Sequence, residues 1–198
     1  NTAGEGKDIA QACAITVDAD RVAFINCRFL ANQDTIYTYG KYQKQYFRGC
    51  WIEGTTDFIF GASTCWFEDC TILSKRDSYV TAASTPEGEE YGYVFKNCRL
   101  IHDEKTTKVY LGRPWRPYAK TVFIGCDLGD HILKEGWHNW NKKYAEKTSF
   151  YAEYGSKGPG AAATERVKWS HQLKAKETLK YTPANVLKTG TEIDKHGN

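Results

Sequence analysis

A six-residue motif recurs five times along the chain, and it limits the possible folds more than any other feature of the sequence. Each copy contains Phe, any residue, a small turn-forming residue, Cys, any residue and a large apolar residue. The copies occupy residues 24–29, 47–52, 67–72, 95–100 and 123–128, with steps of 23, 20, 28 and 28 residues between them. A repeat of this length is typical of solenoids, in which each unit buries its apolar face only by stacking on the next.

The residues within the motif favour strands that meet at a bend. Apolar and polar residues alternate as in a β-strand, and the Asn, Gly or Asp before each Cys tolerates a sharp turn. A strand, a bend and another strand every 20–28 residues predict an all-β fold, a right-handed parallel β-helix with protruding loops and a short C-terminal helical tail. An ordinary β-sandwich is the alternative, although its turn signals should come about every 8–12 residues.

The longer steps between motif copies predict loops that leave the coils. These loops are residues 84–92, 102–107 and 136–160. Thr182 and Pro183 suit an N-cap and a first helical residue, which predicts a short helix through Leu187. We interpret residues 1–198 as one N-terminally incomplete β-helix domain, with a basic tail at 165–198 that packs on the solenoid.

The net charge of +3 is located in the C-terminal tail. Residues 165–198 contain seven Lys or Arg and four Asp or Glu, whereas residues 1–164 contain twenty of each kind. A nucleic-acid groove would carry its basic excess on the body of the fold, so we expect no nucleic-acid partner. No apolar run approaches the roughly 18 residues that a membrane span needs, so we expect no membrane partner.

The cysteines and the start of the chain bear on its cellular context. The chain has seven Cys and no Met, and it begins at Asn1 without a signal peptide, which we interpret as a piece of a longer protein. An odd number of Cys, five of them in the repeat, favours free thiols that pack as small apolar residues. One disulfide that involves Cys13 or Cys65 remains open.

Two carboxylates lie at equivalent positions of successive repeats. Asp34 follows Cys27 by seven residues, and Asp57 follows Cys50 by seven. Each lies in an apolar, β-prone run, where an unpaired charge is costly to bury. Gln11 lies one further 23-residue step before Asp34. If 23 residues form one coil, the three side chains stack about 4.8 Å apart and form a candidate active site.

Four short segments carry a further signal. They are Gln11-Ala12-Cys13-Ala14-Ile15, Gln33-Asp34-Thr35-Ile36-Tyr37, Asp57-Phe58-Ile59-Phe60-Gly61 and Leu111-Gly112-Arg113-Pro114-Trp115. In order and approximate spacing they resemble the signature segments of the pectin methylesterase family, and residues 151–154, 158–161 and 166–169 resemble its C-terminal part. The resemblance covers nearly the whole chain, but the family has a further N-terminal segment with its first coils, and this chain begins after it.

The resemblance implies a reaction and a set of roles. The family hydrolyses methyl esters of galacturonate units in pectin and releases methanol. By position, Asp57 matches the nucleophile that forms an acyl-enzyme, and Asp34 matches the general acid and base. Gln11 and Gln33 match donors to the oxyanion, and Arg113 would keep Asp57 ionised through a bidentate pair. The resemblance implies no cofactor and no metal.

The same resemblance extends to substrate contacts and location. Trp115 matches a substrate-contacting position beside Arg113. Five further aromatic residues are candidates for stacking on sugars by position and type, namely Tyr37, Phe60, Tyr118, Trp137 and Trp140. The expected partner is methyl-esterified homogalacturonan, bound by a monomer. Because pectin lies outside the cytosol, we expect a secreted, extracellular or periplasmic protein.

Other interpretations of these residues and of the fold remain open. An Asp in an apolar run often caps a bend, and stacked Gln side chains can form an amide ladder between coils. The five His show no ligand spacing and none lies in the four segments, so neither zinc nor a Ser-His triad is supported. The alternatives are a catalytically impaired β-helical pectin-binding module, or a pectic lyase or hydrolase on the same fold.

Overall fold

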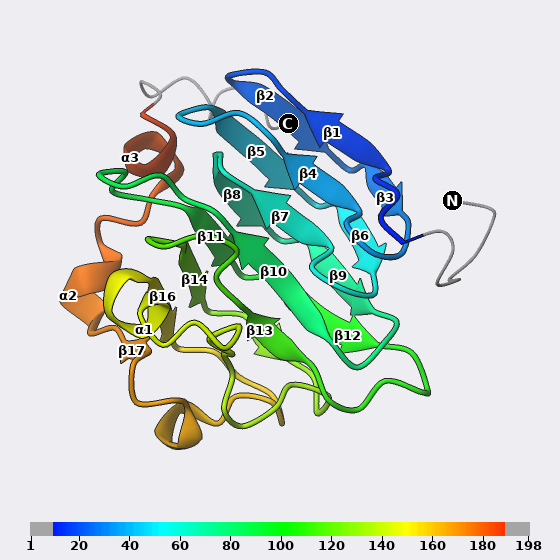
Figure 1. Ribbon diagram of the computed structural model, residues 1–198, viewed down its shortest axis with the longest axis vertical. Coiled ribbons are helices and arrows are strands. Elements are labelled where there is room, and N and C mark those ends of the chain that lie inside the picture. Colours follow the sequence, from blue (N-terminus) through cyan, green and yellow to red (C-terminus); the bar gives the residue numbers. More distant parts are fainter. Residues whose placement is uncertain (1–9, 189–198) are drawn as a thin grey trace.

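The computed structural model describes residues 10–188, and in this part of the chain seventeen strands form three parallel sheets. From β1 to β16 consecutive strands belong to different sheets, and each strand pairs with the strand one coil away. The chain therefore winds as a right-handed parallel β-helix, as the repeat predicts (Figure 1). No helix within residues 10–188 is long and apolar enough to cross a membrane.

Sheet A has five strands in the order β1, β4, β7, β10 and β13, which lie side by side across Figure 1. Their bounds are Ile15–Val17, Ile36–Thr38, Ile59–Gly61, Tyr79–Ala83 and Tyr110–Gly112. Sheet C has the order β3, β6, β9, β12 and β15. Its strands are Arg28–Leu30, Trp51–Gly54, Thr71–Ser74, Arg99–His102 and Asp127–Leu128.

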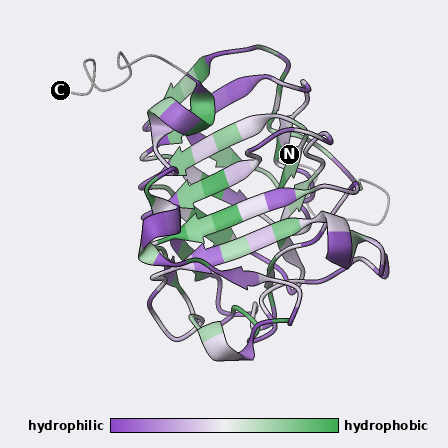
Figure 2. Ribbon diagram, turned by 90° about the vertical axis from the view of Figure 1, so that its left-hand side faces the viewer, coloured by the Kyte–Doolittle hydropathy of each residue, from purple (hydrophilic) through white to green (hydrophobic). Residues whose placement is uncertain are grey.

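Sheet B contains the first half of every motif copy. Its strands are β2 (Val22–Ile25), β5 (Lys44–Arg48), β8 (Thr64–Glu68), β11 (Tyr93–Lys96), β14 (Lys120–Ile124), β16 (Phe150–Tyr154) and β17 (His171–Gln172). The strands stack as parallel rungs in Figure 2, which is coloured by hydropathy. β16 lies within residues 136–160, which the sequence analysis expected as loop. That expectation is wrong for these five residues because pairing with β14 extends the sheet.

The turn-forming residue of the motif makes the corner between sheets B and C in every coil. Asn26, Gly49, Asp69, Asn97 and Gly125 all have left-handed backbone conformations, with φ of 55°, 61°, 52°, 53° and 64°. Gly, Asn and Asp are the residue types that adopt this conformation at least cost. The motif restricts this position to these three types because the corner requires them.

The Phe of each motif copy forms a continuous column inside the solenoid. The five rings stack from coil to coil at centroid distances of 5.0, 4.6, 4.5 and 4.4 Å. The last four rings, from Phe47 to Phe123, are fully buried. Burying a Phe side chain stabilises a fold by about 1.5–3 kcal/mol, so the column is a major part of the core.

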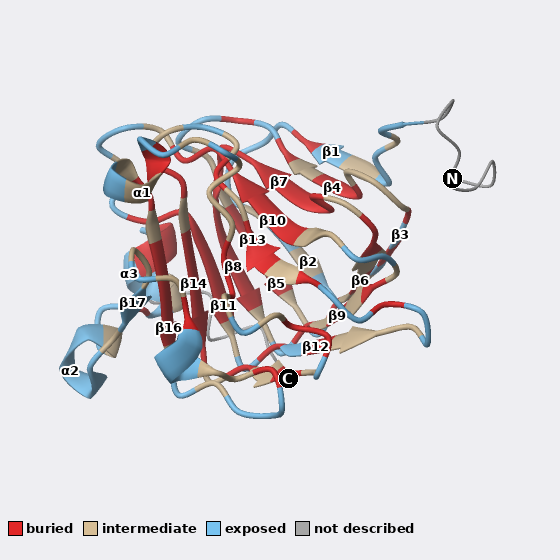
Figure 3. Cartoon of the chain, turned by 60° about the horizontal axis from the view of Figure 1, so that its bottom comes forward, coloured by how far each residue is buried: buried red, intermediate tan, exposed pale blue. Residues whose placement is uncertain are grey.

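The Cys of the motif packs beside this column as a free thiol. From Cys50 onwards the Cys side chains are buried, and all seven cysteines are free. The thiol of Cys70 donates to the carbonyl oxygen of Phe47 in the preceding coil at 3.6 Å, and Cys98 donates to Phe67 at 3.5 Å. The thiols are therefore small core residues that also join neighbouring coils. Across the described residues, buried positions concentrate in the strands (Figure 3).

Short helices lie in the part of the chain after β15. They are α1 (Ala145–Thr148), a 3-10 turn at Ala163–Glu165, α2 (Ala175–Thr178) and α3 (Pro183–Leu187). The expected loop at residues 136–160 is therefore also wrong for the four residues of α1. The predicted C-terminal helix is confirmed, since the Thr182 hydroxyl accepts from the backbone N–H of Asn185 and Pro183 opens α3. Val186 and Leu187 join a second apolar cluster with Trp66, so α3 covers the outer face of sheet B. Of the predicted basic tail, residues 189–198 lie outside the described part.

Candidate active site

Asp34 and Asp57 occupy the same turn in successive coils, where the chain passes from sheet C to sheet A. Both have left-handed backbones, with φ of 63° and 49°. Asp accepts this conformation more readily than most residues, although at some cost in free energy, and such positions concentrate at functional sites. The residue after each Asp, Thr35 or Phe58, is fully buried. The residue that follows each Asp therefore packs in the core, and the Asp itself lies on the outside of the coil.

Strand register brings the two carboxylates together. β4 pairs with β7 so that Ile36 lies opposite Ile59 and Tyr37 opposite Phe60, a step of 23 residues that also relates Asp34 to Asp57. Neighbouring parallel strands are about 4.8 Å apart, so the two carboxylates lie on adjacent coils of one wall. The predicted stacking of these two residues is confirmed.

The predicted position of Gln11 directly above Asp34 is wrong. β1 pairs with β4 so that Ile15 lies opposite Ile36, a step of 21 residues rather than 23. The backbone N–H groups of Ala14 and Ile15 both donate to the carbonyl of Thr35, and this irregular pairing shifts the register. Gln11 nevertheless lines the same cavity as Asp34.

Arg113 reaches Asp57 from two coils away. Its backbone N–H donates to the carbonyl of Thr81, so it follows β13 in register with Ala82 of the intervening coil. The small side chain of Ala82 also lines the cavity and leaves space for the longer side chain of Arg113. Nε and Nη2 of Arg113 donate to the two oxygens of Asp57 at 2.9 and 2.7 Å. Such a bidentate pair is among the stronger hydrogen-bonded contacts in proteins.

Two aromatic rings lie against the guanidinium of Arg113. Its Cζ is 3.8 Å from the ring centroid of Tyr79 and 3.6 Å from that of Trp140. Both contacts are within cation–π distance and restrict how the guanidinium can move. Sequence analysis missed Tyr79, yet it continues the column of the two carboxylates, because Asp57 donates its backbone N–H to the Tyr79 carbonyl. The 23-residue step from Asp57 leads to Val80, whereas β7 and β10 pair with a step of 22, so the sequence repeat alone did not identify Tyr79.

Lys142 is a second residue that sequence analysis missed. Its Nζ donates to the carbonyl oxygens of Pro114 and Trp115 at 3.2 and 2.9 Å and lies 4.4 Å from the ring centroid of Trp140. It thus fixes the loop after Arg113 to the Trp140 segment. No local motif marks this Lys, because its partners are backbone carbonyls far away in the sequence.

The electrostatic environment separates the protonation of the two carboxyl groups. Burial and the charge of Asp57 raise the pKa of Asp34 to about 7, against the opposing effect of Arg113. Burial also raises the pKa of Asp57, but the hydrogen bonds and charge of Arg113 oppose this effect. Because the guanidinium contacts both oxygens of Asp57, we assign the ionised form to Asp57 and the shared proton to Asp34.

A cavity of about 230 Å³ brings the predicted catalytic residues together. Its lining is Gln11, Gln33, Asp34, Asp57, Phe60, Ala82, Arg113, Trp115 and Trp140. All five residues assigned to catalysis from the sequence are present. The cavity combines an ion-paired carboxylate, a carboxyl group that can hold a proton at neutral pH, and two amides. These groups can perform acyl transfer through general acid–base chemistry.

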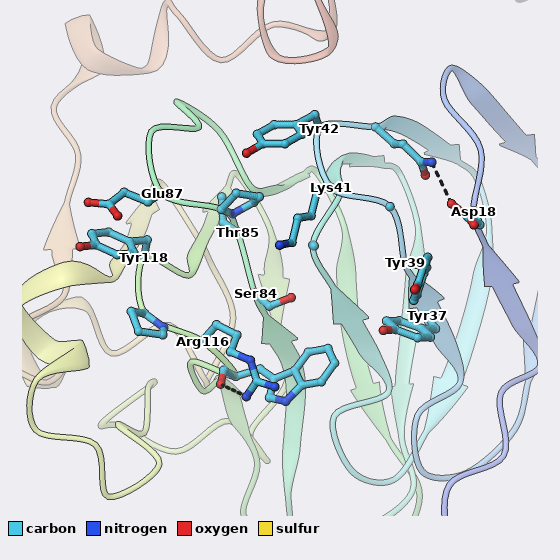
Figure 4. Close-up of a pocket in the computed structure, with 16 residues that line it drawn as sticks. Asp18, Tyr37, Tyr39, Lys41, Tyr42, Ser84, Thr85, Glu87, Arg116 and Tyr118 are labelled. Carbon is cyan, nitrogen blue, oxygen red and sulfur yellow. Dashed lines mark hydrogen bonds between the residues drawn. The ribbon is translucent and has the colours of Figure 1, made fainter.

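A larger hollow of about 840 Å³ adjoins this cavity at Trp115, which lines both. Tyr37 and Tyr39 form one side of the hollow and Tyr118 lies on the opposite side, with the cationic groups of Lys41 and Arg116 between them (Figure 4). The rings of Tyr37 and Phe60 stack at 4.4 Å, and Trp115 meets Phe60 edge-on at 5.7 Å. The predicted aromatic residues Tyr37, Phe60, Trp115 and Tyr118 therefore line one connected surface.

Trp137 is an exception among the predicted sugar-stacking residues. Its side chain is 1% exposed and belongs to the main core. The ring stacks on Tyr151 at 4.4 Å and lies 5.9 Å from Phe123. No face of the ring is open to a ligand, so this prediction is wrong, whereas Trp140 lines the cavity and stacks on Arg113.

Comparisons with known proteins agree with this geometry. A family model described as Pectinesterase matches residues 1–190. Pectinesterase 31 of Arabidopsis thaliana is 44% identical over 174 residues, which are 87% of this chain. The pectin methylesterase from carrot superposes with a TM-score of 0.87 at 30% identity over 96% of this chain. A pectin methylesterase in complex with a hexasaccharide superposes with a TM-score of 0.73 at 28% identity over 89% of this chain.

The match is nearly complete for this chain and partial for its relatives. The chain spans 54% of the Arabidopsis protein, 63% of the carrot chain and 59% of the chain bound to a hexasaccharide. The family model nevertheless covers almost every residue of the chain, and the four segments that it shares with the family surround one cavity. The chain therefore belongs to the pectinesterase family.

Proposed function

We propose that the chain hydrolyses the methyl esters of galacturonate units in pectin and releases methanol, with Asp57 as the nucleophile. The observation that carries the proposal is a pair of carboxyl groups on adjacent coils of one cavity. One is ion-paired with Arg113, and the other has a pKa raised to about 7. A nucleophile and a general acid need this difference in protonation at neutral pH.

In the first step, an oxygen of the Asp57 carboxylate attacks the carbonyl carbon of the methyl ester. The amide N–H groups of Gln11 and Gln33, which line the cavity, would donate to the oxyanion that forms. When the bond between the carbonyl carbon and the methoxy oxygen breaks, the proton of Asp34 passes to that oxygen and methanol leaves. The galacturonyl group then remains bound to Asp57 as an acyl-enzyme.

In the second step, Asp34 is a carboxylate and acts as a base. It removes a proton from water, and the hydroxide attacks the galacturonyl carbon of the acyl-enzyme. Breaking the bond to Asp57 releases galacturonate and restores the nucleophile, while Asp34 holds its proton again. The cycle consumes one water per ester, and the new acid gives its own proton to solvent.

The larger hollow supports a polymeric acidic substrate. It combines the aromatic surfaces of Tyr37, Trp115 and Tyr118 with the cationic groups of Lys41 and Arg116. Sugars pack on aromatic rings, and galacturonate carboxylates would pair with the two cations. The names of the relatives, pectinesterase and pectin methylesterase, support the same substrate class.

Location and oligomeric state follow from the proposed reaction. Methyl-esterified homogalacturonan is a cell-wall polymer, so the proposed enzyme acts after secretion or export to the periplasm. The five residues assigned to catalysis all belong to this chain and line one cavity, so we infer that a monomer suffices for the reaction.

The test is methanol release from highly methylated pectin by the unmodified chain and by Asp57→Asn. We expect methanol and acid at unchanged polymer length from the unmodified chain, and a loss of about a thousandfold or more in the variant. Asn suits the left-handed backbone at this position. Asp69→Asn is the matched control, since Asp69 is an exposed Asp with a similar φ of 52°.

The products separate the proposed function from its alternatives. Turnover that persists in Asp57→Asn would contradict the nucleophile assignment. Unsaturated uronides would indicate a lyase, and new reducing ends would indicate a glycoside hydrolase. Binding of methylated pectin without any methanol, in a folded chain, would identify a pectin-binding module.

A further inference from the structure

Two histidines and an aspartate meet at the late end of the solenoid, away from the catalytic cavity. His102 ends β12, and Asp130 and His131 follow β15 in the next coil. β12 pairs with β15 so that Arg99 lies opposite Asp127, a step of 28 residues that also relates His102 to Asp130. The ligand atoms that these three side chains offer all lie within 4.8 Å of one another.

The hydrogen bonds of His102 orient its ring. Nδ1 donates to the carbonyl oxygen of Asp103 at 2.7 Å, and since a carbonyl only accepts, Nδ1 carries a hydrogen. Nε2 then faces the Oδ1 oxygen of Asp130 at 2.8 Å. This contact is favourable only if Nε2 is also protonated, or if a cation takes the place of that proton. Backbone anchoring of the distal nitrogen is typical of metal-binding histidines.

His131 is a buried imidazole without a hydrogen-bond partner. Its side chain is 1% exposed, and neither ring nitrogen has a partner among the described residues. Its ring centroid is 4.6 Å from that of His102. Buried polar groups rarely lack partners, and such a group calls for a ligand or another explanation.

The geometry points to a binding site for one zinc-like divalent cation, held by His102, Asp130 and His131. Two imidazoles and one carboxylate suit Zn²⁺, Co²⁺ or Ni²⁺, whereas Ca²⁺ and Mg²⁺ prefer oxygen ligands only. Ligands lie about 2.0–2.2 Å from zinc, so neighbouring donor atoms need slightly more than the present 2.8 Å between Nε2 and Oδ1. Asp130, with a side chain 73% exposed, can move outward to provide that space. Water would complete the coordination.

Metal binding would replace a proton and join two coils. A divalent cation bound to Nε2 of His102 releases any proton held there to solvent. His102 belongs to the coil of β12, whereas Asp130 and His131 follow the next strand of the same sheet, so the ion would cross-link them. None of the three side chains lines the catalytic cavity. The site is therefore separate from the proposed esterase chemistry.

The test is titration of the whole 198-residue chain with ZnCl₂ by isothermal titration calorimetry, with CaCl₂ as the comparison. We expect saturable binding of one Zn²⁺ and no comparable binding of Ca²⁺. Asp130→Asn and His102→Asn should each weaken Zn²⁺ binding by about tenfold or more, and Zn²⁺ should raise the Tm of the unmodified chain but not of the variants. His131 is not replaced because its ring is part of the packed interior.

Two controls exclude other metal-binding groups. His171→Ala removes an exposed imidazole outside the cluster and should leave the affinity unchanged. Titration with Co²⁺ should give visible d–d absorption without the near-ultraviolet bands of thiolate ligands, which separates this cluster from the seven cysteines. Three results would overturn the proposal. They are the absence of saturable Zn²⁺ binding, an affinity of both cluster variants equal to that of the unmodified chain, and thiolate bands in the Co²⁺ spectrum.

Discussion

Two bidentate arginine–carboxylate pairs within the described residues have different surroundings. Arg113 donates to Asp57 at 2.9 and 2.7 Å in the cavity, and Arg166 donates to Glu153 at 2.6 and 3.1 Å near the last strands of sheet B. The side chains of the second pair are 2% and 3% exposed, whereas those of Arg113 and Asp57 are 16% and 8% exposed. The same pair of functional groups thus occurs once in a sealed setting and once at an open cavity.

Their remaining contacts explain what each pair can do. Arg166 uses its other N–H groups to donate to the backbone carbonyls of Leu133, Lys134 and Gly160, which ties two further chain segments to the ion pair. Within the described residues, the side-chain hydrogen bonds of Arg113 go to Asp57 alone, and rings cover its faces. A saturated pair is a structural clamp, while a pair that leaves its carboxylate facing a cavity is available for chemistry.

The largest predicted effect is on the sealed pair. Arg166→Ala leaves Glu153 as a buried charge without its partner and also deprives three carbonyls of a donor. We expect a loss of about 3–5 kcal/mol in the free energy of unfolding, measured by urea denaturation. Lys134→Ala is the control, because its ion pair with Glu165 is exposed by 63% and 56% and should contribute less than about 1 kcal/mol. Equal stability of the two variants would show that the sealed pair stabilises the fold no more than an exposed ion pair does.

The corresponding change at the open pair should affect activity more than stability. Without Arg113, the pKa of Asp57 rises further, because the hydrogen bonds and the charge of the guanidinium oppose the effect of burial. Arg113→Ala should therefore lower kcat at pH 7 by about a hundredfold, or about 2.7 kcal/mol in the activation barrier. The pH of maximal activity should move upward, since Asp57 then ionises at higher pH. An unchanged pH profile of methanol release from methylated pectin would argue against this role.

Trp140→Ala sharpens the comparison, because it removes one ring from Arg113 without touching the ion pair. Loss of a cation–π contact costs about 0.5–2 kcal/mol, which corresponds to roughly a 2- to 30-fold decrease in rate. If Trp140 positions Arg113, kcat should fall while KM stays nearly constant. A rise in KM at constant kcat would instead identify Trp140 as a sugar-stacking residue. Trp140→Phe, which retains a ring, should recover most of the lost activity.

The last prediction concerns pH and distinguishes Asp34 from Asp57. Because Asp34 must hold a proton to release methanol, kcat should decline as pH rises through about 7. The raised pKa has a matching effect on stability. The folded state binds the proton more tightly than the unfolded chain, so this stabilisation is complete below about pH 3.8 and is lost as pH rises to about 7.

Asp34→Asn tests this linkage. The stability difference between the unmodified chain and Asp34→Asn should change with pH between about 4 and 7. Urea denaturation at several pH values measures this difference. A constant difference for Asp34→Asn across this window would show that its carboxyl group does not titrate as proposed.

Sequence patterns predicted the features that repeat in every coil. The motif predicts the Phe column, the Cys packing and the corner, because each coil places the same residue in the same environment. The 23-residue step predicts that Asp34 and Asp57 are neighbours, since β4 and β7 keep this step. The same step failed for Gln11, where irregular pairing of β1 changes it to 21.

Features that depend on single long-range contacts could not be read from the sequence. Trp137 and Trp140 lie in one polar segment and look alike, yet one stacks on Tyr151 in the core and the other on Arg113. The five residues of β16 form a strand because β14 offers an edge for pairing. The cluster around His131 also lacks a linear signature, because coil stacking rather than short ligand spacing brings its members together.

The left-handed corner has a consequence for how such a molecule can diversify. From the first Phe of a motif copy to its last apolar residue the chain has constant length, so all variation among the steps of 23, 20, 28 and 28 residues falls elsewhere in the coil. That variable part includes residues 84–92, some of which form the rim of the larger hollow. Insertions or deletions at the rim leave the pitch of the spiral untouched. Changes in the loops at the rim can therefore alter substrate preference, while the motif copies on the other side of the solenoid keep the fold.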